Sequence, residues 1–396
     1  MRFEFATSQR IVFGEGAARG LADAARALLP GISQSRRVAF VVTGAHRDRY
    51  DELLATFDAA GFDLAFAQAS GEPTVATARE ATLLCRERNA SLVLAIGGGS
   101  ALDLGKAVAA LAGNTPADTS PEPLDFLEVV GRGRPLAQPS LPFIAVPTTS
   151  GTGAEVTRNA VLLDEATRVK ASLRSEHMLP RLALVDPELT YSAPPAVTAA
   201  TGMDALTQVL EPFVSPAATP ITDALAREVL PRAPAALRRA FACGDDATAR
   251  RDLSLLSLFG GLSLANAKLG AVHGFAAPLG GVLGAPHGAI CARLLPEVIE
   301  VNLAALRARA PEHPSLERYA QVARMLGGDS TLIADDAVTI TRALAVELGV
   351  APLSRYGLDS SNLESIAAAA AKASSMRGNP VELTAAERVA ILERAL

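Results

Sequence analysis

The sequence contains no tryptophan, and aromatic residues make up only 4% of its 396 residues. Hydrophobic residues nevertheless account for 49% of the chain, so a core must be built mainly from Ala, Leu and Val. Such side chains suit helices and parallel strands that are covered on both faces. A chain of this length exceeds one ordinary core, and two domains are the natural expectation.

Cysteine is also scarce. The chain has three cysteines, Cys85, Cys243 and Cys291, which are odd in number and widely separated, so a disulfide framework is not expected. The first 20 residues mix apolar and charged side chains and contain no apolar core of a signal peptide. Both observations predict a protein of a reducing, cytoplasmic compartment.

Excess charge is missing as well. The net charge is −5 and the pI is about 5.7, which gives no electrostatic reason to expect nucleic acid or an anionic membrane as a partner. Residues 269–292 contain no Asp, Glu, Lys or Arg, a run long enough to span a membrane. Its glycines, its prolines and the pair His273 and His287 would each weaken a helix facing lipid. We therefore predict a buried helix–loop–helix that brings two imidazoles together.

The pattern of secondary structure changes near residue 190. Before it, predicted strands at 3–5, 10–13, 37–43, 63–67, 91–96, 142–146 and 181–185 alternate with helices at 17–29, 49–60 and 75–89. After it, every predicted element is helical: 194–214, 220–242, 247–267, 294–310, 316–326, 333–348 and 361–373. The sequence thus predicts an α/β dinucleotide-binding domain with a Rossmann-like parallel sheet over 1–190, and an all-α domain over 191–396.

A glycine-rich turn follows the apolar strand at 91–96. Gly97, Gly98 and Gly99 leave backbone N–H groups open to an anion, and the helix starting near Ser100 adds its positive N-terminal end. The turn lacks the G-x-G-x-x-G spacing, and many such turns are purely structural. Residues 147–155 form a second loop after a strand, rich in hydroxyl groups. It suits a ligand at the carboxyl edge of the sheet, or equally a helix cap.

Asp204 and Gln208 lie four residues apart on a predicted helix and therefore share one face. Together with His273 and His287 they would give a divalent metal one carboxylate, one amide oxygen and two imidazoles. Such donors suit Fe²⁺ or Zn²⁺ better than Ca²⁺. Taken singly, each of these residues is more often a capped or hydrogen-bonded polar group.

Together these motifs resemble the iron-containing (group III) alcohol dehydrogenase family. The resemblance rests on residues 97–106, 147–157, 185–189, 202–206 and 273–288, which occur in the order of that family. It implies a dehydroquinate synthase-like fold, with a metal and a nicotinamide in the cleft between two domains, and a homodimer. It implies Asp204, His273 and His287 as metal ligands that act in catalysis through the metal. The cofactor contacts expected on the same grounds are Gly44, Gly97, Gly98, Gly99, Ser100, Asp103, Thr148, Thr149, Thr152 and Lys170.

The sequence departs from the family at three places. Gln208 replaces a histidine ligand, but we expect its weaker oxygen still to face the metal. Ala277 replaces a histidine implicated in proton relay. Residues 43–45 lack the aspartate that binds the adenine-ribose 2′-hydroxyl in NAD-specific members. Arg47 and Arg49 lie nearby, where they would pair with a 2′-phosphate or remain solvated. Either NAD or NADP is therefore expected as the cofactor.

We thus predict a metal-dependent alcohol dehydrogenase or aldehyde reductase that transfers a hydride between NAD(P)(H) and a small alcohol or aldehyde, with Fe²⁺, or alternatively Zn²⁺, as Lewis acid. A lyase resembling dehydroquinate synthase is disfavoured because no basic cluster adjoins Asp204 or His273. A reductase resembling maleylacetate reductase stays open, because Arg158 and Arg174 would suit a carboxylate. A non-catalytic nucleotide-binding homologue also stays open. Cys291 is expected to pack rather than bind metal, because four ligands are already present.

Overall fold

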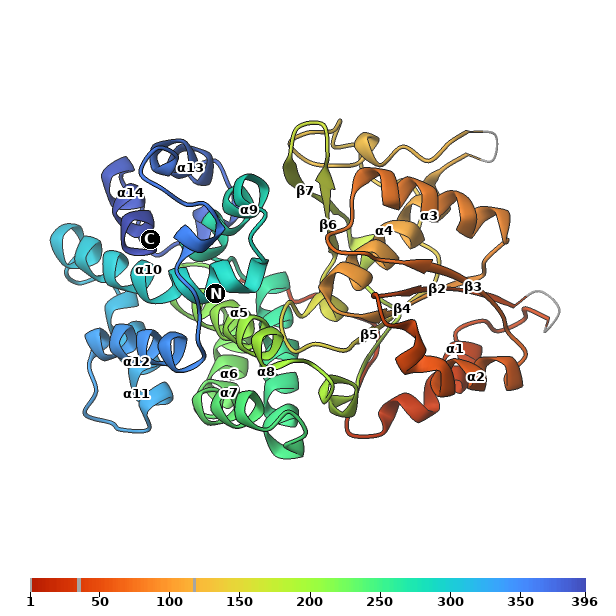
Figure 1. Ribbon diagram of the computed structural model, residues 1–396, viewed down its shortest axis with the longest axis horizontal. Helices are drawn as coiled ribbons and strands as arrows, with labels where there is room; N and C mark the ends of the chain where they lie inside the picture. The colour runs from red at the N-terminus through yellow and green to blue at the C-terminus, as the bar shows by residue number, and fades with distance from the viewer. Residues whose placement is uncertain (1, 34–36, 117–118) are drawn as a thin grey trace. The chain divides into compact units, whose positions relative to one another are not determined.

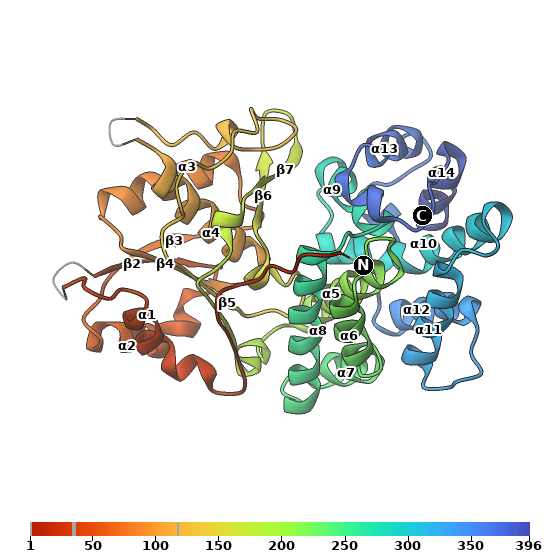
Figure 2. The ribbon, with the colours of Figure 1, turned by 180° about the vertical axis from the view of Figure 1, so that it is seen from behind.

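The computed structural model describes residues 2–33, 37–116 and 119–396, so Met1, the first residue of the predicted α/β domain, lies outside them. The chain divides into two compact units (Figures 1 and 2). One unit contains residues 6–149 and 153–190, and the other contains residues 150–152 and 191–396 together with the N-terminal segment up to Phe5. That the chain forms two domains divided near residue 190 stays a prediction.

The first unit is built on a parallel sheet of six strands in the order β1-β8-β5-β4-β2-β3. Its strands are β1 (Ile11–Phe13), β2 (Val38–Thr43), β3 (Asp63–Gln68), β4 (Leu92–Gly97), β5 (Phe143–Pro147) and β8 (Leu182–Val185). β3 pairs on one side of β2 and β4 on the other, so the direction of winding reverses between β2 and β4. In open sheets of this kind, ligands bind at the carboxyl ends of the strands where the order reverses.

Helices cover both faces of this sheet (Figure 1). Successive side chains of a strand point to opposite faces, so Phe40 and Val42 of β2 pack with one pair of helices and Val41 with the other. The first pair is α3 (Val75–Glu87) and α4 (Gly99–Asn114), and the second is α1 (Leu21–Ala27) and α2 (Asp51–Ala59). Double coverage explains why these strands read as continuous apolar runs, and it confirms the predicted parallel α/β architecture.

Two details of the first half differ from the sequence-based expectation. Residues 3–5 form no strand, although their apolar and charged side chains alternate. Conversely, an unpredicted antiparallel hairpin is formed by β6 (Asn159–Asp164) and β7 (Val169–Arg174). Its strands bury alternate residues such as Ala160 and Leu162 against the α3 and α4 side of the sheet, while Val161 between them is only partly buried.

The second unit is helical. Its helices are α5 (Pro195–Val214), α6 (Pro220–Val229), α7 (Ala233–Ala242), α8 (Ala247–Asn266), α9 (Ala271–Leu283), α10 (His287–Arg309), α11 (Ser315–Gly327), α12 (Ala334–Glu347), α13 (Leu363–Ala370) and α14 (Ala385–Arg394). The single helix expected over 220–242 is divided into α6 and α7 at Pro231, which has no backbone N–H to continue the ladder. The helix expected over 294–310 begins earlier, at His287, and α14 was not predicted.

In the part of the chain that the structure describes, no single helix has the length and apolar character needed to cross a membrane. Helices α8 and α9 meet that criterion only as a pair, and the chain bends by 97° between them.

Candidate metal centre and cofactor-binding turn

Helix α5 carries three acidic or amide side chains on one buried face. Asp204, Gln208 and Glu211 are spaced by four and three residues, and their exposed fractions are only 2%, 2% and 4%. Gly260 of α8 allows close packing at this face, because a Cβ atom there would lie 3.1 Å from the Cβ of Gln208. Polar groups so deeply buried are costly unless they have partners, which marks this face of α5 as a site.

Two further helix ends bring the histidines to that face. His273 lies in the first turn of α9, and His287 is the first residue of α10. The start of α10 packs closely on α5, since a Cβ atom on Gly288 would lie only 2.5 Å from the carbonyl oxygen of Ala200. The glycine that follows His287 is therefore explained by close approach of two helices.

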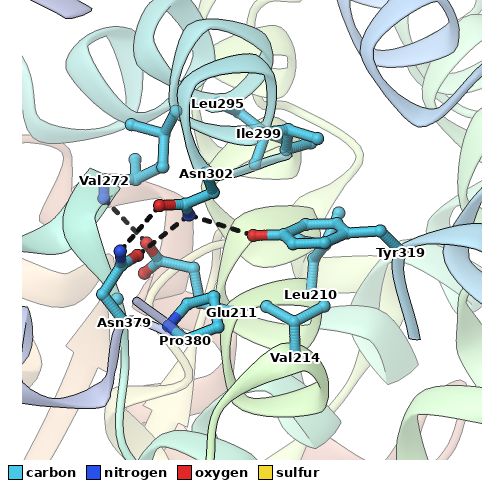
Figure 3. Close-up of a pocket in the computed structure, with 12 residues that line it drawn as sticks. Leu210, Glu211, Val214, Val272, Leu295, Ile299, Asn302, Tyr319, Asn379 and Pro380 are labelled. Carbon is cyan, nitrogen blue, oxygen red and sulfur yellow. Dashed lines mark hydrogen bonds between the residues drawn. The ribbon is translucent and has the colours of Figure 1, made fainter. Parts of the chain in front are cut away.

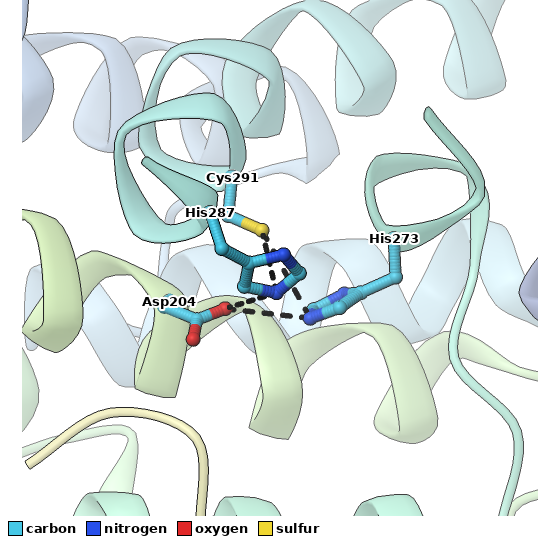
Figure 4. Close-up of side chains that lie close together, drawn as sticks. All are labelled: Asp204, His273, His287 and Cys291. Atoms are coloured by element: carbon cyan, nitrogen blue, oxygen red, sulfur yellow. Dashed lines mark hydrogen bonds and ion pairs between the residues drawn. The ribbon is translucent and has the colours of Figure 1, made fainter. Parts of the chain in front are cut away.

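The two histidines, the aspartate and a cysteine form one cluster (Figure 4). Asp204 Oδ1 lies 3.4 Å from His273 Nε2 and 3.6 Å from His287 Nε2. Cys291 Sγ lies 3.9 Å and 3.7 Å from the same two nitrogens. The four atoms all lie within 4.8 Å of one another. We call Asp204, His273, His287 and Cys291 the four-residue cluster.

Glu211 orients one of these imidazoles. Its Oε2 atom lies 2.7 Å from His273 Nδ1, and its Oε1 atom accepts a hydrogen bond of 2.7 Å from the backbone N–H of Val272. A carboxylate held at Nδ1 fixes the tautomer in which Nε2 keeps its lone pair and raises the basicity of that nitrogen. His273 therefore presents the lone pair of Nε2 to the cluster, as many metal-bound histidines do.

A layer of buried amides lies behind Glu211, around a small pocket (Figure 3). The side chains of Asn302 and Asn379 hydrogen-bond to each other at 2.7 and 3.0 Å. Asn302 also donates to the hydroxyl of Tyr319 at 3.0 Å, and Asn379 accepts from the backbone of Ala271 at 3.2 Å. These contacts tie the first turn of α9, and with it His273, to α10 and α11.

The polar atoms of the cluster fit a bound cation. Asp204 Oδ1 is buried and accepts no hydrogen bond, although it lies beside the two imidazoles, and Oε1 of the adjacent Gln208 is also buried and accepts none. The amide nitrogen of Gln208 donates to the other carboxylate oxygen, Asp204 Oδ2, at 3.2 Å. Oxygen, imidazole and sulfur donors gathered within a few ångströms are the ligand types of Zn²⁺ and related divalent metals.

The pKa shifts of the cluster residues also indicate that positive charge stabilises this site. Burial by itself would lower the pKa of His287, but Cys291 and Asp204 raise it to about 9. The pKa of His273 is likewise raised well above its usual value, against the effect of burial, by Cys291, Asp204 and Glu211. Burial would raise the pKa of Asp204, yet the charges of His287 and His273 lower it. The same positive charge can be supplied by a metal ion, which displaces the imidazole protons.

In the sheet-containing unit, several predicted cofactor contacts meet at the strand reversal. Gly44 follows β2 and Gly97 ends β4, and a Cβ atom on Gly97 would lie 2.6 Å from the Cβ of Ala101 and 3.3 Å from the backbone nitrogen of Gly44. A Cβ atom on Gly98 would lie 3.2 Å from the hydroxyl oxygen of Thr149. Helix α4 begins at Gly99, and its N-cap residue, a glycine, provides no side-chain cap. This is an open helix N-terminus of the kind that binds phosphate.

Asp103 and Lys170 have partners within the chain. Asp103 accepts a hydrogen bond of 3.1 Å from the backbone of Val161, and its other oxygen lies 3.1 Å from the ammonium group of the buried Lys106. Lys170 forms an ion pair of 2.9 Å with Glu72. Both residues therefore have partners within the chain, and their contact with a cofactor stays a prediction.

The remaining predicted contacts are divided between the units. Ser100 lies in the first turn of α4, and Thr148 follows β5, where its backbone N–H donates to the carbonyl oxygen of Gly97 at 2.9 Å. Thr152 belongs to the helical unit. The roles of all three toward a cofactor also stay predictions.

The arginines considered for other ligands are also engaged. Arg158 pairs with Glu176, and Arg174 lies 3.3 Å from Glu128. These ion pairs give no support to the expectation that the two arginines serve a substrate carboxylate. The guanidinium of Arg47 lies over the ring of Phe66, 4.6 Å from its centroid, at the edge where an adenine ribose is expected.

Two residues of the site were not expected from the sequence. Glu211 was not singled out, although it lies seven residues beyond Asp204 and so on the same helical face. Cys291 packs in the apolar core of the helical unit, as expected, and its thiol in addition lies within the cluster. The position four residues after His287 on a helix was the available indication. The sequence predicts a helix only from residue 294, which leaves Cys291 outside it.

Known families match nearly the whole chain. The pattern described as iron-containing alcohol dehydrogenase matches residues 8–187, and that of the Fe-containing alcohol dehydrogenase family, C-terminal, matches residues 198–396. Long-chain-alcohol dehydrogenase 1 of Geobacillus thermodenitrificans is 37% identical over 331 residues, which are 82% of this chain and 80% of that protein.

Solved structures agree with these matches. A 1,3-propanediol oxidoreductase superimposes with a TM-score of 0.89 at 29% identity, over 100% of both chains. Sulfoacetaldehyde reductase from Bifidobacterium kashiwanohense, solved with NAD⁺, superimposes with a TM-score of 0.85 at 29% identity, over 99% of this chain and 98% of that one.

Proposed function

Because this chain belongs to the iron-containing alcohol dehydrogenase family, we propose that it is a metal-dependent alcohol dehydrogenase or aldehyde reductase that uses a nicotinamide cofactor. The similar proteins act on substrates as different as long-chain alcohols, 1,3-propanediol and sulfoacetaldehyde, as their names state. The shared chemistry is the interconversion of an alcohol and a carbonyl compound. We therefore assign the reaction class and leave the substrate as a small alcohol or aldehyde.

The observation that carries this proposal is the metal-binding geometry around Asp204. The carboxylate and the two Nε2 atoms converge, and the lone pair of His273 is directed by Glu211. We propose that Asp204, His273 and His287 hold Fe²⁺ or Zn²⁺. The sequence nominates Gln208 for the fourth position.

When they are bound, the metal supplies a Lewis acid for the substrate oxygen and the nicotinamide supplies the hydride carrier. The chain contributes orientation and a surrounding of low polarity, because Asp204 and His273 expose only 2% and 6% of their side chains. His287 exposes 36% of its side chain and is the ligand nearest to solvent. Ala277 offers no proton-transferring group one turn after His273. Proton transfer is therefore proposed to use water rather than a side chain at that position.

For the dinucleotide, we propose a site at the turn 97–99 and the loop at Gly44. The helix N-terminus at Gly99 and the close approach of Gly44 to Gly97 support a pyrophosphate there. Residues 43–45 carry no carboxylate to repel a 2′-phosphate, and Arg47 lies nearby. We therefore propose that both NADH and NADPH bind.

Two further expectations belong to this proposal. A homodimer is expected from the family, and light scattering of the purified protein tests it. A reducing, cytoplasmic compartment is expected from the three cysteines, which form no disulfide in the structure.

The test is the metal content of anaerobically purified protein, combined with NADH- and NADPH-dependent reduction of a series of short aldehydes. We expect about one Fe or Zn per chain and turnover that is lost on chelation and restored by the metal. Asp204→Ala should contain no metal and show no turnover. Turnover that persists after verified removal of all metal would falsify the proposal.

A further inference from the structure

We propose that the thiolate of Cys291, rather than the amide of Gln208, is the fourth protein ligand of the metal, and that the centre therefore favours Zn²⁺ over Fe²⁺. This inference rests on the proposed function, because it concerns the same metal centre. It adds a ligand that the sequence-based expectation assigned to core packing.

Helix geometry places Cys291 correctly for this role. Helix α10 begins at His287, so Cys291 lies one turn later on the same face. Cys291 is fully buried, so solvent does not compete for its sulfur atom. Cys291 packs in the apolar core of the helical unit, and its thiol in addition has two imidazole nitrogens at 3.7 and 3.9 Å (Figure 4).

The distances between the ligand atoms agree with one tetrahedral metal ion. With usual zinc–nitrogen, zinc–oxygen and zinc–sulfur bonds, tetrahedral geometry places two N or O ligands about 3.3 Å apart and an N and an S ligand about 3.6 Å apart. The structure has 3.4 and 3.6 Å for the two Asp204–imidazole pairs. It has 3.7 and 3.9 Å for the two Cys291–imidazole pairs. These four of the six ligand pairs are thus close to the spacing that a metal requires, and the other two lie within 4.8 Å.

The amide of Gln208 instead hydrogen-bonds to one of the metal ligands, Asp204. Its amide nitrogen donates to Asp204 Oδ2 at 3.2 Å, while Asp204 Oδ1 faces the imidazoles without a hydrogen bond. Reversing the amide would place two oxygens against each other at that distance, so the bond fixes the orientation of Gln208. Gln208 thus holds the orientation of Asp204, and in this inference its own buried, unbonded Oε1 is not a metal ligand.

The ligand set has a consequence for the choice of metal. Thiolate is a soft donor that favours Zn²⁺, whereas carboxylate, amide and imidazole alone discriminate less against Fe²⁺ or Mn²⁺. Binding requires Cys291 to release its proton to solvent as the sulfur–metal bond forms. No oxidant or reductant takes part. We expect Cys291→Ser to lower the ratio of Zn²⁺ to Mn²⁺ affinity by at least about tenfold.

The test uses Co²⁺ in place of the native metal, with the full-length protein. Thiolate–cobalt bonds give an intense near-ultraviolet charge-transfer absorption, and four-coordinate Co²⁺ gives strong visible bands. We expect both in the wild-type protein and in Gln208→Ala. In Cys291→Ser the near-ultraviolet band should disappear while Co²⁺ still binds. Cys85→Ser removes another buried thiol, in α3, and should change neither band.

The outcomes separate this inference from the proposed function. One Co²⁺ per chain that is lost in Asp204→Ala, but shows no sulfur band, would overturn the role of Cys291 and leave the proposed metal centre intact. Absence of Co²⁺ binding in the wild-type protein would overturn both. If Cys291→Ser does not fold, X-ray absorption of the zinc-loaded wild-type protein decides instead. A sulfur atom at about 2.3 Å from zinc supports the inference, and a shell of only N and O atoms contradicts it.

Discussion

Single side chains behind the metal ligands influence how tightly those ligands bind the metal. Glu211 holds His273 through Nδ1, at 2.7 Å. Loss of such a partner usually reduces metal affinity by about tenfold to 100-fold. We expect Glu211→Gln to do so, measured by competition with a chromophoric chelator. Glu317→Gln, at an exposed glutamate on α11, is the matched control and should leave the affinity unchanged. An unaltered affinity in Glu211→Gln would show that the backbone alone orients His273.

The buried carboxyl group of Glu155 allows a second prediction, which concerns how stability depends on pH. Burial raises its pKa from 4.5 to about 7, although a backbone hydrogen bond and Lys106 act in the opposite direction. The glutamate thus binds its proton more tightly in the folded chain than in the unfolded chain. Its contribution to stability is complete below about pH 4.5 and is lost as the pH rises through about 7.

Glu155→Gln should therefore remove part of the destabilisation that the wild-type protein shows on going from pH 5 to pH 8. The pKa shift of Glu155 corresponds to at most about 3 kcal/mol in the free energy of unfolding, since each pKa unit is worth about 1.4 kcal/mol. Denaturant unfolding at both pH values measures it. Glu364→Gln, at an exposed position on α13, is the control. An identical pH dependence in the wild type and Glu155→Gln would contradict the assignment.

At the scale of elements, the junction of α5 and α10 positions His287. A Cβ atom on Gly288 would lie 2.5 Å from the carbonyl oxygen of Ala200, so one helix must move to admit it. We expect Gly288→Ala to lower the free energy of unfolding by about 1–3 kcal/mol, typical of overpacking, and to weaken metal binding. Gly20→Ala, where no atom lies within 4 Å of the new Cβ, should do neither. Normal metal affinity in Gly288→Ala would show that α10 adjusts without displacing His287.

The loop after β2 is the element expected to choose between NADH and NADPH. A Cβ atom on Gly44 would meet nothing within 4 Å, so the fold tolerates a side chain there. We expect Gly44→Asp to weaken NADPH binding at least about tenfold more than NADH binding, because its carboxylate repels the 2′-phosphate. Gly44→Asn has the same size without the charge. Equal effects of Gly44→Asp on both cofactors, measured by fluorescence titration, would place the adenosine elsewhere.

For the whole molecule, the metal ligands and the glycine turn belong to different units of the chain. Changes at independent positions usually have additive effects, within a few tenths of a kcal/mol. Asp204→Ala should therefore abolish turnover while the Kd of NADH changes by less than about twofold. Calorimetric titration of the variant measures this Kd. Loss of NADH binding together with the metal would show that the two sites are coupled.

The sequence by itself determined the features encoded by contiguous residues. Apolar runs such as 91–96 gave the parallel strands because both faces of the sheet are covered. The spacing of Asp204 and Gln208 placed them on one helical face. The charge-free run at 269–292 indicated that His273 and His287 meet, and the resemblance to a family then implied that both bind the metal. Local patterns were less reliable where burial is one-sided, as in β6 and β7, or where an extended segment has no strand partner, as at 3–5.

Only the tertiary structure decided which atoms meet. Cys291 and Glu211 are ordinary helical residues in the sequence, and nothing local distinguishes them from core or capping residues. The packing of α9 and α10 on α5 brings the thiol to 3.9 Å from His273 and the carboxylate of Glu211 to 2.7 Å from the same imidazole. These contacts join residues 18 and 62 positions apart in sequence, so they depend on how the helices pack and not on any local preference.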